Sequence, residues 1–196
     1  MHVLLIALYS YLLGALPSAY LIGKFKHVDI TSEGSGNIGG TNAYRVLGAK
    51  LGVLVALMDV GKVIAALLIT MNWWGGEALA VATSALFAVV GHNWSVYVGF
   101  RGGKGIAVSI GTYVFLFPGL GLVGLLIALF NVIVTKYVSL GSLNFVAAMT
   151  ALLWTVPGYA LEYRILSVLL MAMAVYRHRS NITRLREGSE RRFGQS

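Results

Sequence analysis

The chain alternates between long apolar segments and short polar ones. The apolar segments cover residues 3–23, 51–71, 78–99, 106–117, 119–135, 141–156 and 161–176. A helix needs about 20 apolar residues to cross a bilayer, and several segments are shorter than that. The segment 106–117 stops before Pro118, and we expect it to be either a short tilted helix or half of a bent one. The pattern predicts an all-α bundle of membrane-spanning helices.

The composition also indicates a membrane protein. Hydrophobic residues make up 58% of the 196 residues and charged residues 11%, with a mean hydropathy of +0.79. A soluble domain cannot hide that much apolar surface in one core, so lipid must be the solvent for most of the chain. The sequence has no cysteine, which excludes disulfides, thiolate metal sites and a cysteine nucleophile.

The distribution of positive charge predicts the topology. Positive residues occupy the first, third and fifth connections at Lys24, Lys26, Arg45, Lys50, Arg101, Lys104 and Lys136. The C-terminal tail adds Arg177, Arg179, Arg184, Arg186, Arg191 and Arg192. The second connection, 72–77, has no positive charge. Basic loops stay in the cytoplasm, so the sequence predicts an N-out, C-in protein with about seven transmembrane helices. Joining 106–117 to 119–135 would leave six helices and put the basic tail outside.

The sequence also predicts the nature of the first apolar segment and the number of domains. The first apolar segment lacks a basic n-region and a small-residue cleavage site, so we expect it to be a permanent span and not a signal peptide. We find no internal repeat, and we predict a single membrane domain over 1–196. The net charge of +8 comes from basic residues in the connections and the tail, as expected for segments on the cytoplasmic side. No nucleic-acid partner is therefore expected.

The first polar connection contains a glycine-rich loop. Residues 34–42 read Gly-Ser-Gly-Asn-Ile-Gly-Gly-Thr-Asn, and Arg45 follows. The match to G-x-G-x-x-G does not indicate a dinucleotide site, because no strand precedes it. The glycines allow backbone N–H groups to turn inward, while short polar side chains and Arg45 add donors. The loop suits an anion; the alternative is an ordinary flexible loop.

A second glycine-rich segment begins where the third span closes, at residues 91–95. It runs from Gly91 and His92 to Arg101, Gly102, Gly103, Lys104 and Gly105. It is not a P-loop, because Val98 and Gly105 stand where that pattern needs a glycine and a hydroxyl. Glycines and a lysine at the start of a helix nevertheless suit a second phosphate. The alternative is that Arg101 and Lys104 only anchor the topology.

The tail opens with a third polar segment, 177–190. At helical spacing His178, Asn181 and Leu185 share one face, and the arginines could reach anionic headgroups. A basic helix on the membrane surface would explain the charge but not His178 and Asn181. A smaller cluster, 138–142, is expected on the same side.

Two further features of the sequence have ordinary explanations. The four histidines show no metal-ligand spacing, so we predict no metal site, and His92 alone would be a structural hydrogen-bonding residue. Asp59 and Lys62 lie three residues apart within the second span and should face a polar interior. A structural pair and a catalytic role remain open for them.

Together these segments resemble the PlsY family of bacterial membrane glycerol-3-phosphate acyltransferases, which use acyl phosphate as donor. The family motif S-G-N-x-G-A-T-N is seen from Ser35 to Asn42, with Gly40 in place of alanine. The motif running from G-H-x-x-S/P to G-G-K-G is seen from His92 to Gly105, and R-H-R-x-N-I-x-R-L-x-x-G-x-E from Arg177 to Glu190. The resemblance implies a seven-helix membrane fold without a cofactor.

The resemblance also implies a reaction. The 1-hydroxyl of glycerol 3-phosphate attacks the acyl-phosphate carbonyl, which gives 1-acylglycerol 3-phosphate and inorganic phosphate. The implied catalytic residues are Ser35, Arg45, Lys104, His178 and Asn181. The implied substrate-binding residues are Gly36, Asn37, Thr41, Asn42, His92, Gly102, Gly103, Gly105, Ser142, Gly188 and Glu190. Membrane lipids and the soluble enzyme that makes acyl phosphate are the other expected partners, and the site should face the cytoplasm of a bacterial plasma membrane.

Rival functions fit the sequence less well. A transporter of phosphorylated solutes would normally show repeat symmetry. A polyprenyl-phosphate transferase usually needs aspartate clusters for magnesium, which are missing. A structural scaffold has no need for three donor-rich segments. For the acyl transfer itself we expect direct attack without an acyl-enzyme, with either the donor phosphate or His178 taking the proton.

Overall fold

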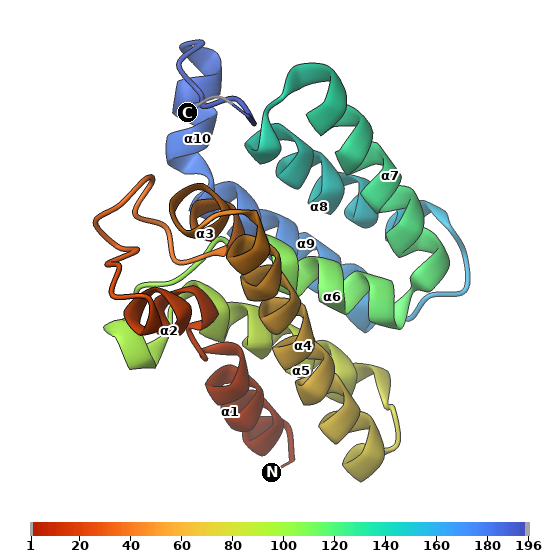
Figure 1. The fold of residues 1–196 in the computed structure, drawn as a ribbon. Coiled ribbons are helices and arrows are strands. Elements are labelled where there is room, and N and C mark those ends of the chain that lie inside the picture. The colour runs from red at the N-terminus through yellow and green to blue at the C-terminus, as the bar shows by residue number, and fades with distance from the viewer. Residues whose placement is uncertain (1, 195–196) are drawn as a thin grey trace. The chain divides into compact units, whose positions relative to one another are not determined.

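The computed structural model describes residues 2–194 and is shown in Figure 1. Its helices are α1 His2–Gly14, α2 Ser18–Phe25, α3 Gly40–Leu47, α4 Ala49–Trp74, α5 Ala78–Asn93, η1 Val96–Val98, α6 Ile106–Leu116, α7 Pro118–Thr135, α8 Val138–Thr155, α9 Leu161–Arg177 and α10 Arg179–Arg186. Extended pairing within 2–194 is limited to a single bridge between Ser95 and Arg101. The all-α prediction is therefore confirmed. The chain forms two compact units, one ending at Thr112 and the other beginning at Tyr113, and the prediction of a single domain stays a prediction.

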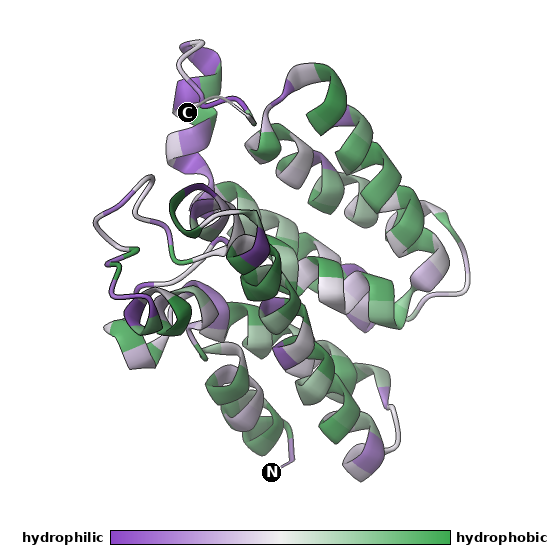
Figure 2. Ribbon diagram, viewed as in Figure 1, coloured by the Kyte–Doolittle hydropathy of each residue, from purple (hydrophilic) through white to green (hydrophobic). Residues whose placement is uncertain are grey.

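Several helices are suited to a bilayer. Four segments are long and apolar enough to cross it, namely His2–Phe25, Ala49–Trp74, Pro118–Thr135 and Val138–Thr155. Two shorter apolar helices, Ala78–Asn93 and Ile106–Leu116, accompany them. Figure 2 shows α7 as hydrophobic along most of its length, whereas α10 is largely hydrophilic. The multi-span membrane fold is confirmed, while the count of seven and the N-out, C-in orientation stay predictions.

Two of the predicted segments end differently in the structure. The segment 3–23 is divided after Gly14, because Pro17 has no N–H for a continuous helix, and α2 begins at Ser18. The apolar segment 78–99 is longer than the helix that it contains. Helix α5 ends at Asn93, after which the Ser95 hydroxyl donates to the Ala15 carbonyl. Pro118 starts the new helix α7 and does not bend a continuous one.

In the first unit, α1 packs closely against α5. A methyl group on Gly14 would lie 2.0 Å from the Ala88 carbonyl oxygen, and one on Gly91 would lie 2.2 Å from the Tyr11 carbonyl oxygen. Ser10 and Ser84 share a hydrogen bond of 2.9 Å between the same helices. Small residues and interhelical hydrogen bonds hold helices together where lipid removes the hydrophobic drive.

In the second unit, α7 and α8 form an antiparallel pair (Figure 1). Gly124 leaves room for Phe145 and Met149, and the Asn144 amide donates to Asn131 Oδ1 at 2.7 Å. Helix α8 is joined to α9 by the Thr150 hydroxyl, which donates to the Ser167 carbonyl at 3.1 Å. These contacts again combine small residues with buried polar bonds.

We expect Gly14→Ala to lower the free energy of unfolding by about 1–3 kcal/mol, because the new methyl group overlaps the backbone of α5. Gly61→Ala is the matched control, since the space around Gly61 in α4 is open within 4 Å. There the better helix propensity of alanine should leave stability unchanged or slightly higher. Thermal unfolding of the detergent-purified variants measures both. Equal behaviour of the two variants would contradict the close α1–α5 contact.

Candidate active site

The first glycine-rich loop joins α2 to α3 and is organised by Asn42. This side chain is 1% exposed. Its Oδ1 accepts from the Ser35 N–H at 2.8 Å and from the Ser35 hydroxyl at 3.1 Å. Its Nδ2 donates to the carbonyls of Ile30 and Glu33, both at 3.1 Å. The amide therefore uses its two donors and both acceptor positions within the loop.

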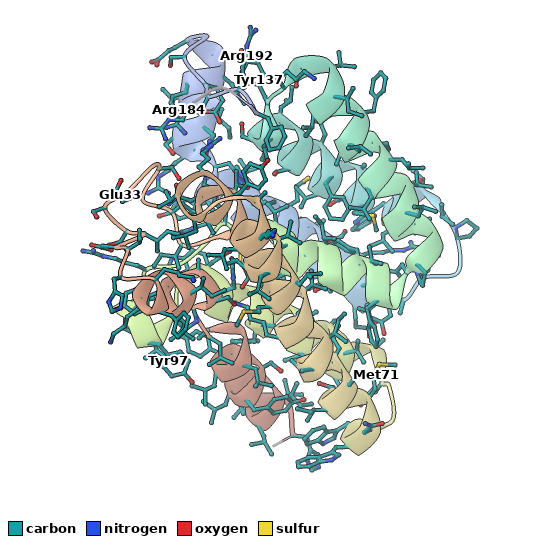
Figure 3. The ribbon with its side chains drawn as sticks, viewed as in Figure 1. Glu33, Met71, Tyr97, Tyr137, Arg184 and Arg192 are labelled. Carbon is teal, nitrogen blue, oxygen red and sulfur yellow. The ribbon has the colours of Figure 1, made fainter. Side chains whose placement is uncertain are left out.

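This geometry gives Asn42 a structural role. Its side chain shapes the loop and positions Ser35, while its predicted contact with substrate stays a prediction. Gly34 and Gly36 have φ values of 62° and 67°, a left-handed conformation that glycine adopts without strain. Ser35, Thr41 and Arg45 are exposed, and Asn37 is half-buried. Figure 3 shows Glu33 on the same loop, ahead of α3.

The second glycine-rich segment packs against the end of α5. The Gly103 N–H donates to the His92 carbonyl at 3.0 Å. A methyl group on Gly102 would lie 2.2 Å from the same carbonyl oxygen. One on Gly103 would lie 2.0 Å from His92 Nε2 and 2.9 Å from the carbonyl oxygen of Ile38. Because Ile38 belongs to the first loop, the two glycine-rich loops and His92 meet at Gly103.

Lys104 and Gly105 complete this segment. Gly105 has a φ of 80° and lies over the buried amide of Asn93, whose side-chain atoms find no hydrogen-bond partner among the described residues. Lys104 is half-buried and stands two residues before α6. The backbone of this segment thus requires glycine on either side of the lysine. Close packing adds a structural reason for glycines that were predicted to admit substrate.

In the second unit, Glu190 holds the tail in place. Its Oε1 accepts from Ser139 Oγ and from Asn181 Nδ2, both at 2.7 Å, and its Oε2 pairs with Arg184 Nε at 2.8 Å. Burial alone would raise the pKa of this carboxyl group, but the hydrogen bonds from Asn181, Ser139 and Arg184 prevail and lower it. Glu190 therefore fixes the orientation of the Asn181 amide.

His178 lies at the junction of α9 and α10. It is 3% exposed, and its Nδ1 is 2.8 Å from the Ala174 carbonyl oxygen. A carbonyl can only accept, so Nδ1 carries the hydrogen. In neutral His178 the lone pair is then on Nε2, where a proton can be accepted. This tautomer is compatible with the role of base, and protonated His178 would donate through the same atom.

The predicted residues are divided between the two units. The first contains Ser35, Gly36, Asn37, Thr41, Asn42, Arg45, His92, Gly102, Gly103, Lys104 and Gly105. The second contains Ser142, His178, Asn181, Gly188 and Glu190. The structure joins Ser35 to Asn42, His92 to Gly103, and Asn181 to Glu190.

The sequence analysis missed the importance of Ser139. Ser142 Oγ donates to the Val138 carbonyl of its own helix at 2.8 Å, whereas Ser139 reaches Glu190. Arg184 was noted only for its charge. The sequence signal for both was Glu190, the acid at the end of the third motif, because a carboxylate needs hydrogen-bond donors once it is buried. Over residues 2–194, no three His, Cys, Asp or Glu side chains come together as a potential metal site.

Comparison with known proteins identifies the chain's relatives. The family model described as glycerol-3-phosphate acyltransferase matches residues 4–188. The chain belongs to this family. The glycerol-3-phosphate acyltransferase of Shouchella clausii is 45% identical over 193 residues, which cover 96% of this chain and 94% of the relative.

Two solved structures have the same fold as this protein over almost its whole chain. The glycerol 3-phosphate form of PlsY, an integral membrane glycerol 3-phosphate acyltransferase, matches with a TM-score of 0.93 and 36% identity. Its lysophosphatidic acid form has a TM-score of 0.90 and 36% identity. Each match covers 99% of this chain and 96% of the other. The protein is therefore an acyltransferase of phospholipid synthesis and an integral membrane protein.

The contacts of Glu190 predict a pH dependence. Because its pKa is lowered in the folded protein, the stabilisation that it provides is complete above the ordinary value of 4.5 and is lost as pH falls through the lower folded value. We expect Glu190→Gln to remove this acid-dependent loss and to destabilise the protein at neutral pH. Thermal unfolding of both proteins between about pH 3 and pH 7 measures it. Parallel pH profiles would contradict the assigned contacts.

Proposed function

We propose that the protein transfers an acyl group from acyl phosphate to the 1-hydroxyl of glycerol 3-phosphate. The products are 1-acylglycerol 3-phosphate, a lysophosphatidic acid, and inorganic phosphate. The observation that carries this proposal is the meeting of two glycine-rich loops at Gly103, next to Lys104. Both substrates carry a phosphate group, and two adjoining loops of this kind suit two phosphates. The solved relative in its glycerol 3-phosphate form supports the acceptor.

The chemistry of the donor supports acyl phosphate. The general-base pattern H-x-x-x-x-D of another class of glycerolipid acyltransferases is missing, because none of His2, His27, His92 and His178 has an aspartate five residues later. An acyl phosphate is a mixed anhydride, and its phosphate leaves with little need for a general acid. The protein then contributes mainly orientation and charge stabilisation.

We expect the hydroxyl to attack the carbonyl directly. A carbon–oxygen ester bond forms, the acyl–phosphate bond breaks, and the electron pair leaves with inorganic phosphate. Lys104 and Arg45 neutralise phosphate charge, while Ser35, Asn37 and Asn181 orient the substrates. The hydroxyl proton goes either to the donor's phosphate oxygen or to Nε2 of His178, whose tautomer has the lone pair there.

The same proposal includes the cellular setting. The basic connections and tail should face the cytoplasm of a bacterial plasma membrane. Glycerol 3-phosphate is water-soluble, so it would reach a cytoplasmic site directly. The long acyl phosphate would enter from the membrane lipids or from the soluble enzyme that produces it.

The experiment that tests the function is a turnover assay with purified protein. Acyl phosphate and glycerol 3-phosphate together should yield inorganic phosphate and lysophosphatidic acid, and acyl-CoA should not replace the donor. Protein incubated with acyl phosphate alone should show no added acyl mass by intact-mass spectrometry. A stoichiometric adduct on Ser35 or Ser142 would refute direct attack, and activity with acyl-CoA would refute the assigned donor.

Lys104→Ala and Arg45→Ala should each reduce kcat/KM at least about tenfold, because a charged hydrogen bond to phosphate is worth about 1.5–3 kcal/mol. The control is Arg192→Ala. Arg192 is exposed and lies with its guanidinium carbon 5.6 Å from the centre of the Tyr137 ring (Figure 3). It should leave kcat/KM nearly unchanged. Similar losses in all three variants would mean that the positive charge serves only topology.

The N-out, C-in orientation can be tested with single cysteines, since the natural chain has none. Ser35→Cys and Ser189→Cys should resist a membrane-impermeant thiol reagent in intact spheroplasts and react after lysis. Gly76→Cys, between α4 and α5, is the matched position on the opposite side and should react in intact spheroplasts. Labelling of the first two variants from outside would reverse the topology.

A further inference from the structure

Four buried polar residues, one of which is His92, form a cluster in the first unit. Asp59, Lys62, His92 and Ser18 are 1%, 8%, 7% and 3% exposed. Asp59 and Lys62 come from the middle of α4, Ser18 from the start of α2, and His92 from the end of α5. Ionisable groups within membrane helices are costly, so a partnered cluster at this depth calls for an explanation.

The Lys62 ammonium has three acceptors for its three hydrogens. They are the Leu16 carbonyl at 2.8 Å, Asp59 Oδ1 at 2.9 Å and His92 Nδ1 at 3.0 Å. Asp59 Oδ1 also accepts from the Ser18 hydroxyl at 2.8 Å. The Leu16 carbonyl lies in the break between α1 and α2, where helical bonding is interrupted. The cluster is therefore a closed network in which the ammonium is the central donor.

This network determines the tautomer of His92. An ammonium can only donate, so His92 Nδ1 must accept and its hydrogen must be on Nε2. The alternative, a hydrogen on Nδ1 directed at Asp59, is opposed by the distance of 3.6 Å between Nδ1 and Asp59 Oδ1. The other ring nitrogen, Nε2, faces Gly103 at the junction of the two glycine-rich loops.

We infer that Asp59 and Lys62 are positioning residues of the acyl transfer that act through His92. They hold His92 as the Nε2–H tautomer, and this ring in turn sets the junction of the loops at Gly103, beside Lys104. This inference rests on the proposed function. It assigns a catalytic purpose to the Asp59–Lys62 pair, whose pairing was anticipated from sequence but whose purpose was open.

The first test is the tautomer itself. The chain has four histidines, so nitrogen-15 NMR of histidine-labelled protein in detergent gives few signals, and His92→Gln assigns those of His92. In the wild-type protein we expect an unprotonated Nδ1 and a protonated Nε2. A protonated Nδ1, alone or together with Nε2, would overturn the inference. This measurement needs no substrate, and its result is read on the wild-type protein.

The second test separates positioning from plain stability. Removing one charge leaves the other unpaired, but exchanging both groups together can preserve the fold. We expect the double variant Asp59→Asn/Lys62→Met to lose the single His92 tautomer and at least about tenfold in kcat. The KM for glycerol 3-phosphate should change less than about twofold. Thr70→Val is the control, a buried polar residue of α4 whose hydroxyl donates to Ala66. It should leave kcat and the His92 signals unchanged.

Each outcome has a defined meaning. A folded double variant with wild-type kcat would overturn the inference, because the pair would then be purely structural. If the double variant does not fold, the wild-type tautomer decides. Absence of turnover with acyl phosphate in the wild-type protein would refute the proposed function, whereas the tautomer measurement would still show whether Lys62 holds His92.

Discussion

The Lys62 ammonium lies within a membrane helix, where a charge is stable only if its hydrogens meet acceptors. Those acceptors come from three places far apart in the sequence, namely the break before α2, Asp59 in α4 and His92 at the end of α5. The requirement to surround one charge therefore fixes how α1, α4 and α5 meet. The helix break at Pro17 is part of the same arrangement, because it provides the Leu16 carbonyl.

The contacts of Lys62 also affect the glycine-rich loops, through His92. His92 contacts Gly103, and Gly103 leaves no room for a side chain between His92 and Ile38. Asn42 then holds the remainder of the first loop through four hydrogen bonds. Ser35, an exposed residue proposed to meet phosphate, thus lies on a loop whose shape these buried contacts set, and Arg45 lies in α3, directly after that loop. Positioning of this kind is what a reaction with a good leaving group needs most.

The second unit applies the same principle with a carboxylate at the centre. Glu190 gathers Ser139 from α8 with Asn181 and Arg184 from α10, and so attaches the polar tail to an apolar helix. Each centre is a buried ion with complementary hydrogen-bond partners: acceptors surround the Lys62 ammonium, and donors surround the Glu190 carboxylate. In each centre, the ion fixes the orientation of one proposed site residue. Asn181 is oriented by Glu190, and His92 by Lys62.

The sequence alone determined the all-α membrane architecture, because hydrophobic segments of sufficient length leave a chain no other way to satisfy its backbone in lipid. It also located the three glycine-rich or basic motifs and the family, because these depend on residues close together in the chain. It also placed the close of the third span at residues 91–95, although apolar residues continue to Gly99, and α5 ends at Asn93. It named Ser142 among the expected site residues and did not single out Ser139. Only the tertiary structure decided which polar groups meet, that Asn42 is occupied within its loop, and which nitrogen of His92 bears the hydrogen. The contacts behind those facts join residues from 7 positions apart, Ser35 with Asn42, to 51 positions apart, Ser139 with Glu190, and no local pattern encodes them.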